Sequence, residues 1–343
     1  MRDTTQQDSR QANSDRSRRG GQGRPDRDRR GPADRRNNGR NSRPSFPEAR
    51  QTSAVRKAFE QLTAMHPDKR LILETRPDEK LGRWIDLMTP IGKGQRCLIV
   101  SPPKAGKTTL LKTISQALTK NHPDVVQLVL LVDERPEEVT DFSRNVKAKV
   151  IASSSDKSTE NHVEKTRGVL EEAMQLVLDG KDAMILLDSI TRLARAFNLH
   201  LDSQSKTLSG GLGANAMQEP RQFFGAARKV ENGGSLTVVA TALVDTGSRM
   251  DDVIFQEFKG TGNMELVLDR DLAEKRMFPS INIRESGTRK EELLYPAKTY
   301  QGLVALRQIL AGLSPEDGFR MMDKVLGDFK KNDDLLLQLT PKT

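Results

Sequence analysis

Short apolar runs alternate with amphipathic segments along most of this sequence. Continuous apolar runs predict buried strands at 97–100, 125–132 and 183–187, and further strands are expected at 149–152 and 235–243. Helical spacing of apolar residues predicts helices at about 51–65, 110–118, 159–179, 189–198, 214–230, 301–311 and 316–329. Because strands alternate with helices, the pattern predicts an α/β fold with a mainly parallel sheet and right-handed crossovers.

The segment after the first strand has the composition of a phosphate-binding loop. Residues 101–109 read Ser-Pro-Pro-Lys-Ala-Gly-Lys-Thr-Thr and lead directly into an amphipathic helix. A strand, a loop and a helix in this order aim backbone N–H groups and the positive helix end at one point, where a triphosphate fits. Lys107 is placed to reach the β- and γ-phosphates, and the Thr108 hydroxyl is placed to bind Mg²⁺. Pro102 and Pro103 lack N–H groups, so the rest of the cradle must come from Lys104, Ala105, Gly106 and Thr109.

Two acidic residues end the next two apolar runs. Glu134 follows the run at 125–132, and Asp188 follows the run at 183–187. The carboxyl ends of parallel strands border the crevice where ligands bind in open α/β sheets. Asp188 is therefore placed to hold Mg²⁺ through water, and Glu134 to orient or deprotonate an attacking water. Both acids could instead cap the following helices, but beside a Gly-Lys-Thr loop the pattern favours hydrolysis of ATP or GTP.

The charge of the chain is concentrated at its N-terminus. Residues 1–50 contain 14 Arg, no Lys and 7 acids, so they carry +7 of the total net charge of +9. One aromatic residue and few aliphatic ones cannot offset the entropy of ordering, which predicts a disordered tail at 1–47. The tail could follow an RNA backbone or act only as a solubilising segment. We expect a short connector at 48–94 and a motor domain at 95–343.

Cys97 is the single cysteine of the chain and lies within an apolar strand. An intramolecular disulfide is excluded, and we expect a buried, inert thiol in a reducing compartment. No apolar run approaches the length of a membrane span, and the Arg-rich start lacks the apolar core of a signal peptide. These features predict a cytoplasmic protein without a membrane partner.

Two polar loops interrupt the predicted framework, at 200–213 and 245–251. The first contains Lys206 and a glycine-rich stretch, and the second contains Arg249. Both could be plain surface turns. Mobile loops with basic side chains could instead hold a polyanion and move with the nucleotide state.

Long stretches of the sequence resemble the Rho family of transcription termination factors. The resemblance covers roughly residues 51–343 and is closest at 92–118, 127–143, 183–198, 207–250 and 258–294. It includes the phosphate loop, which has Ser101 where the usual pattern has Gly, and the Asp-Glu-Arg-Pro-Glu-Glu-Val-Thr stretch at 133–140. Members of this family are ring-forming, RNA-dependent ATPases and helicases with a RecA-like P-loop NTPase core. The resemblance therefore implies ATP and Mg²⁺ as ligands, RNA as a partner and a homo-oligomeric ring of six subunits.

The resemblance also implies roles for individual residues. Lys104, Lys107 and Thr108 would bind the phosphates and Mg²⁺, Asp188 would lie on the metal side, and Glu134 would be the catalytic glutamate with Arg135 beside it. Phe278 would pack on the adenine, and Arg289 would be an arginine finger offered to the ATP of the neighbouring subunit. Two loops would contact RNA in the pore of the ring, through Lys206, Ser209, Gly210, Gly211 and Arg249.

One departure from the family leaves three functions open. Family members ordinarily begin with an oligonucleotide-binding barrel, which needs five strands and stacking aromatics, and the polar tail offers neither. The chain could be a termination factor, a Rho-like RNA translocase without autonomous termination, or a modulatory subunit of other Rho rings. RNA polymerase or a loading factor would be a further partner. Intact Lys107, Glu134, Asp188 and Arg289 favour a working motor over the modulatory subunit.

Overall fold

The computed structural model describes residues 53–201, 212–213 and 215–341. The tail predicted at 1–47 lies outside the described residues, and so do Lys206, Ser209, Gly210 and Gly211 of the glycine-rich loop. Residues 51–343 form one compact unit, and the boundary expected within it, between 48–94 and 95–343, stays a prediction. No helix in the described part of the chain is long and apolar enough to cross a membrane.

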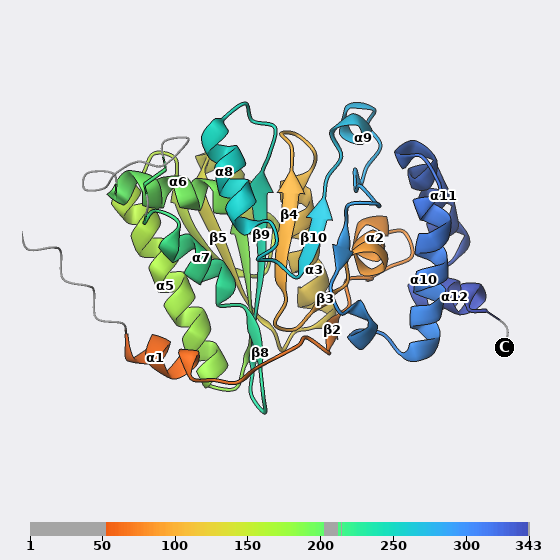
Figure 1. Ribbon diagram of the computed structural model, residues 1–343, viewed down its shortest axis with the longest axis horizontal. Coiled ribbons are helices and arrows are strands. Elements are labelled where there is room, and N and C mark those ends of the chain that lie inside the picture. Colours follow the sequence, from red (N-terminus) through yellow and green to blue (C-terminus); the bar gives the residue numbers. More distant parts are fainter. Residues whose placement is uncertain (1–52, 202–211, 214, 342–343) are drawn as a thin grey trace, which may run out of the picture. The chain divides into compact units, whose positions relative to one another are not determined.

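Strands and helices alternate through this unit (Figure 1). The strands are β1 (Ala64–Met65), β2 (Arg70–Leu71), β3 (Ile91–Gly92), β4 (Arg96–Ser101), β5 (Val126–Glu134), β6 (Lys149–Ser154), β7 (Asp182–Asp188), β8 (Arg228–Val230), β9 (Ser235–Leu243), β10 (Met264–Val267) and β11 (Gly287–Thr288). The helices are α1 (Ala54–Glu60), α2 (Lys80–Met88), α3 (Lys107–Asn121), α4 (Pro136–Asn145), α5 (Thr159–Leu178), α6 (Ile190–Leu201), α7 (Gln218–Gly225), α8 (Arg249–Phe258), α9 (Arg270–Glu274), α10 (Ala297–Ala311), α11 (Pro315–Asp328) and α12 (Asn332–Leu339), with a 3₁₀ turn, η2, at Glu291–Leu293.

The central sheet is mainly parallel, as the alternating pattern predicts. Its strand order is β11-β10-β4-β9-β7-β5-β6, and every neighbouring pair from β10 to β6 is parallel. β11 adds an antiparallel edge strand, and β8 pairs antiparallel with both β9 and β1. The carboxyl ends of β4, β5, β7 and β9 therefore meet at one edge of the sheet, which is where the loop and both strand-end acids were expected.

Both faces of the sheet are covered, which explains the continuous apolar runs of its strands. Along β4, Cys97 and Ile99 pack on the side of α2, α3 and α10–α12, whereas Leu98 and Val100 pack on the side of α5–α8. All four side chains are buried. Cys97 is buried as expected, and burial raises the pKa of its thiol, so it stays protonated and unreactive.

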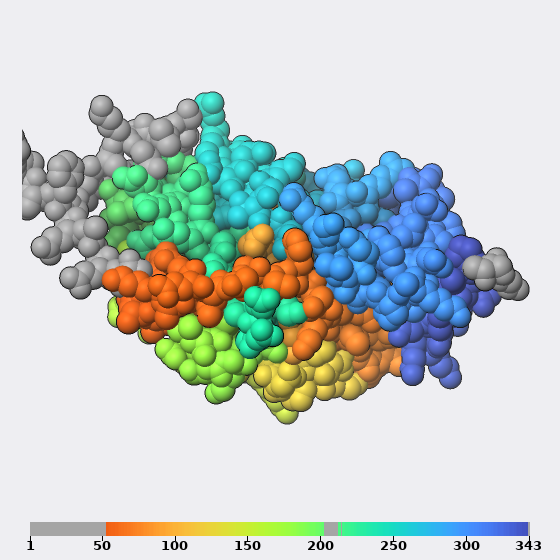
Figure 2. All heavy atoms as spheres, turned by 60° about the horizontal axis from the view of Figure 1, so that its bottom comes forward, coloured from red at the N-terminus to blue at the C-terminus, as the bar shows by residue number. Residues whose placement is uncertain are grey.

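The N-terminal segment of the described chain lies along the surface of this core. Figure 2 shows it in orange, passing close to the green residues of α5 and the teal turn between β8 and β9. Phe59 of α1 is buried, and the guanidinium of Arg228 lies 4.6 Å from its ring centre. β1 then pairs with β8 and ties the segment to the sheet.

Two of the predicted elements are wrong in part. The helix expected at 214–230 ends at Gly225, and 228–230 form β8, because the turn at Asn232-Gly233 folds this segment back onto β9. The helix expected at 51–65 spans only Ala54–Glu60 in the described residues, because the chain extends to pair with β8, and Met65 is 47% exposed. In addition, α8 begins at Arg249 inside the segment read as a loop.

Candidate nucleotide-binding and catalytic site

The phosphate loop connects the end of β4 to the start of α3. Lys104 has φ 65° and Gly106 has φ 101°, so the backbone curls in the left-handed region before the helix begins. A Cβ at Gly106 would meet nothing within 4 Å, so the backbone angle and not crowding requires glycine here. The carbonyl of Ala105 accepts a hydrogen bond of 2.9 Å from the buried Ser280 hydroxyl, which fixes the loop against the segment after Phe278.

Lys107 lies between the two strand-end acids. Its Nζ donates to Glu134 Oε1 at 3.1 Å and to Asp188 Oδ1 and Oδ2 at 2.8 and 2.7 Å. Asp188 also accepts a hydrogen bond of 2.8 Å from the Thr241 hydroxyl at the end of β9. The acids meet because β5 and β7 are neighbours, with Leu131 in register with Asp188. The structure therefore brings together three of the catalytic residues named from the sequence.

The charges of this cluster shift each other's proton affinity. Burial raises the pKa of Glu134, and the positive charges of Lys107 and Arg192 oppose that shift without cancelling it. Burial alone would lower the pKa of Lys107, but Asp188 and Glu134 raise it overall, so the ammonium stays charged. Glu134 Oε2 is buried and has no hydrogen-bond partner among the described residues, which leaves an oxygen able to accept a proton from water.

A bulge at the end of β5 aims Glu134 into the site. Asp133 has φ 54°, and the pairing with β6 shifts register between Val132 and Glu134. Arg192 of α6 holds this bulge, because its Nη1 donates to the Asp133 carbonyl and its Nη2 lies 3.6 Å from Glu134 Oε1. Arg192 was not among the residues named from the sequence; its place four residues after Asp188 was the only available signal.

Arg135 does not join this cluster. Its side chain is 69% exposed and lies 3.6 Å from Glu138, one turn along α4. The resemblance implied that it lies beside the catalytic glutamate in the site, whereas the structure has its guanidinium exposed to solvent and paired with Glu138.

Phe278 lines a cavity next to the phosphate loop. The cavity has a volume of about 580 Å³, and its wall includes Ala105, Gly106 and Thr109 of the loop and α3, with Leu81 of α2. The Phe278 ring is 46% exposed. An exposed aromatic ring beside a phosphate loop provides a stacking surface for a nucleotide base.

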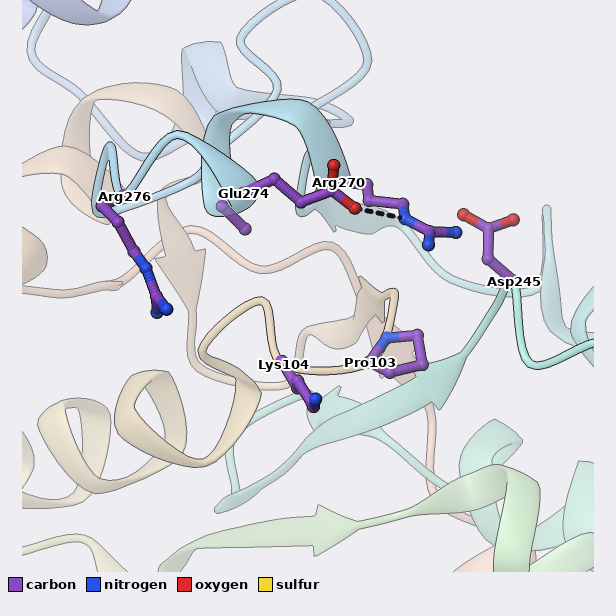
Figure 3. Close-up of a pocket in the computed structure, with 7 residues that line it drawn as sticks. Pro103, Lys104, Asp245, Arg270, Glu274 and Arg276 are labelled. Atoms are coloured by element: carbon purple, nitrogen blue, oxygen red, sulfur yellow. Dashed lines mark hydrogen bonds and ion pairs between the residues drawn. The ribbon is translucent and has the colours of Figure 1, made fainter.

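A second cavity, of about 420 Å³, borders the other side of the loop (Figure 3). Pro103 and Lys104 of the loop face Arg270 and Arg276, from α9 and the residues after it. Arg270 pairs with Glu274 at 2.9 Å, whereas no ion pair engages Arg276 among the described residues. Asp245 and Glu274 line the same cavity, so Arg276 and Lys104 are the basic side chains there that no ion pair neutralises among the described residues.

Thr108 and Asp188 are the residues that would hold Mg²⁺. Among the residues the structure describes, no group of three or more His, Cys, Asp or Glu is placed to bind a metal ion. A Mg²⁺ of the phosphate-loop type does not need such a group, because nucleotide phosphates and water supply most of its ligands. One hydroxyl at the start of α3 and one buried strand-end carboxylate fit that donor set.

Arg289 lies at the opposite end of the sheet from the phosphate loop. Its backbone N–H donates to the Asn263 carbonyl at 2.8 Å, next to Met264, which is in register with Cys97 near the start of β4. The phosphate loop follows Ser101 at the other end of that strand, roughly 13 Å away at the usual rise per residue. Arg289 is exposed there, at the end of the strand that is remote from the phosphate loop of its own chain.

Arg249, the described member of the predicted RNA contacts, is the exposed first residue of α8. The same helix turn contains Asp251, which is buried and accepts two hydrogen bonds, of 2.7 and 2.6 Å, from Arg195. Arg195 is on α6, one turn after Arg192. One helix thus contacts both the bulge beside Glu134 and the start of α8.

Solved structures share this fold. An ATPase from the type III secretion system of pathogenic bacteria superimposes with a TM-score of 0.69 at 22% identity, over 82% of this chain and 87% of that one. The assembled ATPase of the type III secretion system of enteropathogenic E. coli gives a TM-score of 0.65 at 22% identity, over 80% and 72% of the two chains.

The fold and the phosphate loop define a nucleotide-binding domain of the ATP synthase alpha/beta family, which matches residues 82–288. Transcription termination factor Rho of Chromobacterium violaceum is 52% identical over 288 residues, which cover 83% of this chain and 69% of the relative. The chain belongs to the transcription termination factor Rho family.

Other relatives with the same name are similar to the same part of the chain. Rho of Bacillus subtilis is 55% identical over 78% of this chain and 62% of its own length. Rho of Borreliella burgdorferi is 54% identical over 80% of this chain and 53% of its own length. The chain thus spans between about half and two thirds of the length of these two relatives.

Proposed function

We propose that this chain is the motor of a ring ATPase that couples ATP hydrolysis to movement along RNA and so releases transcripts. The observation that carries the proposal is the cluster of the half-buried Lys107 with the buried acids Glu134 and Asp188 at the carboxyl ends of β4, β5 and β7. The relatives of this chain are Rho proteins, and a lysine with two strand-end acids is the set of residues with which a phosphate-loop ATPase binds and hydrolyses its nucleotide.

Each residue of the site has a role in this proposal. Lys107 and Lys104 would stabilise the phosphates, with the backbone of 105–109 around them, and Phe278 would stack on the adenine. Thr108 and Asp188 would hold Mg²⁺, which neutralises phosphate charge when bound. Glu134 would take the proton of the attacking water through its unpartnered Oε2. Arg135 would turn from solvent towards the phosphates.

The position of Arg289 supports a ring. An arginine finger must reach the γ-phosphate, and Arg289 is at the wrong end of its own sheet to do so. A neighbouring subunit would bring its own phosphate loop to this edge, and a closed ring of such head-to-tail contacts gives every site one finger. We infer a homo-hexamer, the ring size that the resemblance to the Rho family implies.

The connection through α6 supports a coupling between RNA and ATP. RNA bound by Arg249 would shift the start of α8, and the bonds between Asp251 and Arg195 would transmit that shift to α6. Arg192 on the same helix holds the bulge that aims Glu134, so the shift would reach the catalytic glutamate. The second RNA contact, at Lys206, Ser209, Gly210 and Gly211, belongs to the residue stretch that follows α6. We also propose a cytoplasmic location, and RNA polymerase or a loading factor as a further partner.

Turnover of ATP with and without an unstructured RNA such as poly(C) tests the proposal. We expect RNA to stimulate Mg²⁺-dependent hydrolysis, and Lys107→Ala to remove turnover in both conditions. Hydrolysis that is equal with and without RNA would contradict the proposed function, as would activity that survives Lys107→Ala.

The pKa of Glu134 predicts the acid limb of the rate profile. Because burial raises this pKa above its usual 4.5, the carboxylate gains its proton at a higher pH than a free glutamate would. A protonated Glu134 cannot act as a base. When the pH is lowered, kcat at saturating MgATP should therefore begin to fall while the pH is still above 4.5. A kcat that is flat down to pH 4.5, in protein whose circular dichroism shows it still folded, would show that Glu134 is not the base.

Arg249→Ala is expected to weaken RNA binding without damaging the ATP site. Loss of one phosphate contact on single-stranded RNA should reduce the slope of log affinity against log salt by about 0.7. The RNA concentration for half-maximal ATPase stimulation should rise, while turnover without RNA stays unchanged. Arg320→Ala, at an exposed arginine of α11, is the matched control. An unchanged salt slope in Arg249→Ala would remove this residue from the RNA contact.

A further inference from the structure

Arg83 of α2 is a charged residue in the interior of the protein. Its side chain is fully buried, with 0% of its surface exposed. Nε donates to Asn332 Oδ1 at 3.1 Å, and Nη1 donates to the carbonyls of Pro77 and Leu326 at 3.2 and 2.7 Å. Glu74 Oε1 lies 3.4 Å from Nε and balances the charge. Nη2 is buried and has no hydrogen-bond partner among the described residues, so these contacts compensate the desolvation of the guanidinium only in part.

One of these bonds fixes a wall of the cavity that contains Phe278. Pro77 lies between Arg76 and Asp78, and both of these residues line that cavity with Glu79. Glu79 then caps α2, since its carboxylate accepts from the backbone N–H groups of Leu81 and Gly82 at 3.1 and 3.0 Å. The guanidinium therefore anchors the loop that faces Phe278 across the cavity.

Gly82 limits how this wall can shift. A Cβ at this position would lie 2.3 Å from the Leu73 carbonyl oxygen, so the start of α2 is packed directly on backbone. The start of α2, which follows the wall, is therefore fixed against backbone, and the bond to Pro77 ties the wall itself to Arg83.

The remaining bonds of Arg83 belong to the C-terminal helices. Leu326 is near the end of α11, and Asn332 is the first residue of α12. Asn332 returns a bond of 3.1 Å from its Nδ2 to the Arg83 carbonyl, and its backbone N–H donates to Glu74. Lys80 adds an ion pair of 2.5 Å to Asp323 of α11. The same buried group thus joins α11 and α12 to the cavity wall.

We propose that Arg83 is a positioning residue that sets nucleotide affinity by holding the 76–79 wall of the base cavity, and that it links the C-terminal helices to that cavity. This inference rests on the proposed function in one respect, because it takes the cavity beside Phe278 as the site of the base. Arg83 touches neither the phosphate loop nor Glu134, so the chemical step should not depend on it.

The full chain with Arg83→Met tests this inference, because methionine keeps apolar bulk and removes all three hydrogen bonds. We expect the KM for ATP to rise about tenfold, which corresponds to a loss of ~1.4 kcal/mol in binding, while kcat stays within about twofold. Tripolyphosphate presents the same phosphate groups to the phosphate loop as ATP does, but has no base. Its inhibition constant against wild-type and variant should therefore be equal, which separates the cavity wall from the loop.

Three further variants keep the outcome interpretable. Arg83→Lys should restore part of the affinity, because an ammonium can reach one carbonyl but not all three acceptors. Asn332→Leu breaks the same link from α12 and should raise KM in the same direction. Val169→Ala, in the core of α5 on the other face of the sheet, should lower the melting temperature and leave KM unchanged.

Two results would overturn the inference while leaving the proposed function intact: an unchanged KM in folded Arg83→Met, or an equal loss of tripolyphosphate affinity. Wild-type protein that neither binds nor hydrolyses ATP would instead contradict the proposed function itself.

Discussion

Arg289→Ala is expected to reduce ATP turnover by about 10³–10⁵-fold, the range for loss of an arginine finger in phosphoryl transfer. The reason is positional: Arg289 is exposed at the end of the sheet remote from its own phosphate loop, so we propose that it acts on the ATP of a neighbouring subunit. ATP binding should be nearly unchanged, since the finger stabilises charge that develops in the transition state. Steady-state turnover and equilibrium binding of a fluorescent ATP analogue measure the two effects.

Mixing experiments separate a finger that acts on a neighbour from a local defect. Arg289→Ala subunits should inhibit wild-type subunits more than in proportion to their fraction, and wild-type activity per subunit should fall on dilution below the assembly concentration. Arg320→Ala serves as a matched control, because this arginine is exposed on α11 and pairs only with Asp317 among the residues described. Equal activity per subunit in monomers and rings would refute the role of Arg289.

Glu134→Gln is expected to lower kcat by about 10²–10⁴-fold, as for the loss of a general base. Glutamine keeps the shape and the contact to Lys107 but cannot accept the proton of water. Affinity for ATP should be retained or increased, because removing a buried negative charge beside the phosphates relieves repulsion. Glu137→Gln, at an exposed position on α4 three residues later, is the control and should be fully active. Near-normal turnover in Glu134→Gln would mean that another group takes the proton.

The sequence predicts the parts of the fold that depend on local patterns. β4, β5 and β7 are buried on both faces, so their sequences are continuous apolar runs and were found with small errors at their ends. The strand-end positions of Glu134 and Asp188 follow from the same runs. Their meeting with Lys107 is then a consequence of parallel pairing, which the alternation of strands and helices already implies.

Features that depend on distant partners could not be read in the same way. Arg83 and Asp86 of α2 are buried inside the protein. Because both residues are charged, the sequence of this buried helix has the pattern of an exposed polar segment. Two of the acceptors of Arg83, Asn332 and Leu326, lie 249 and 243 positions further along the chain, and no local pattern contains them. Asp86 accepts backbone N–H groups of Leu73 and Glu74, and burial raises its pKa to about 7.

The same limit applies within the candidate site. The bulge at Asp133 and the contact with Arg192 arise from the packing of α6 against the end of β5, which no local pattern shows, so Arg192 was missed. The strand β8 shows the opposite case. The Asn-Gly turn that follows it is a local signal for a hairpin. The sequence prediction nevertheless extended the helix to residue 230, because the apolar residues of 214–230 have helical spacing.

The central claim is that ATP hydrolysis drives movement along RNA. Its most direct test is the release of a short labelled DNA strand annealed to an RNA, with purified chain and either ATP or the slowly hydrolysed analogue ATPγS. We expect release with ATP, little release with ATPγS, and none with Lys107→Ala. RNA-stimulated hydrolysis without strand release, on RNAs with single-stranded extensions at either end, would contradict the account.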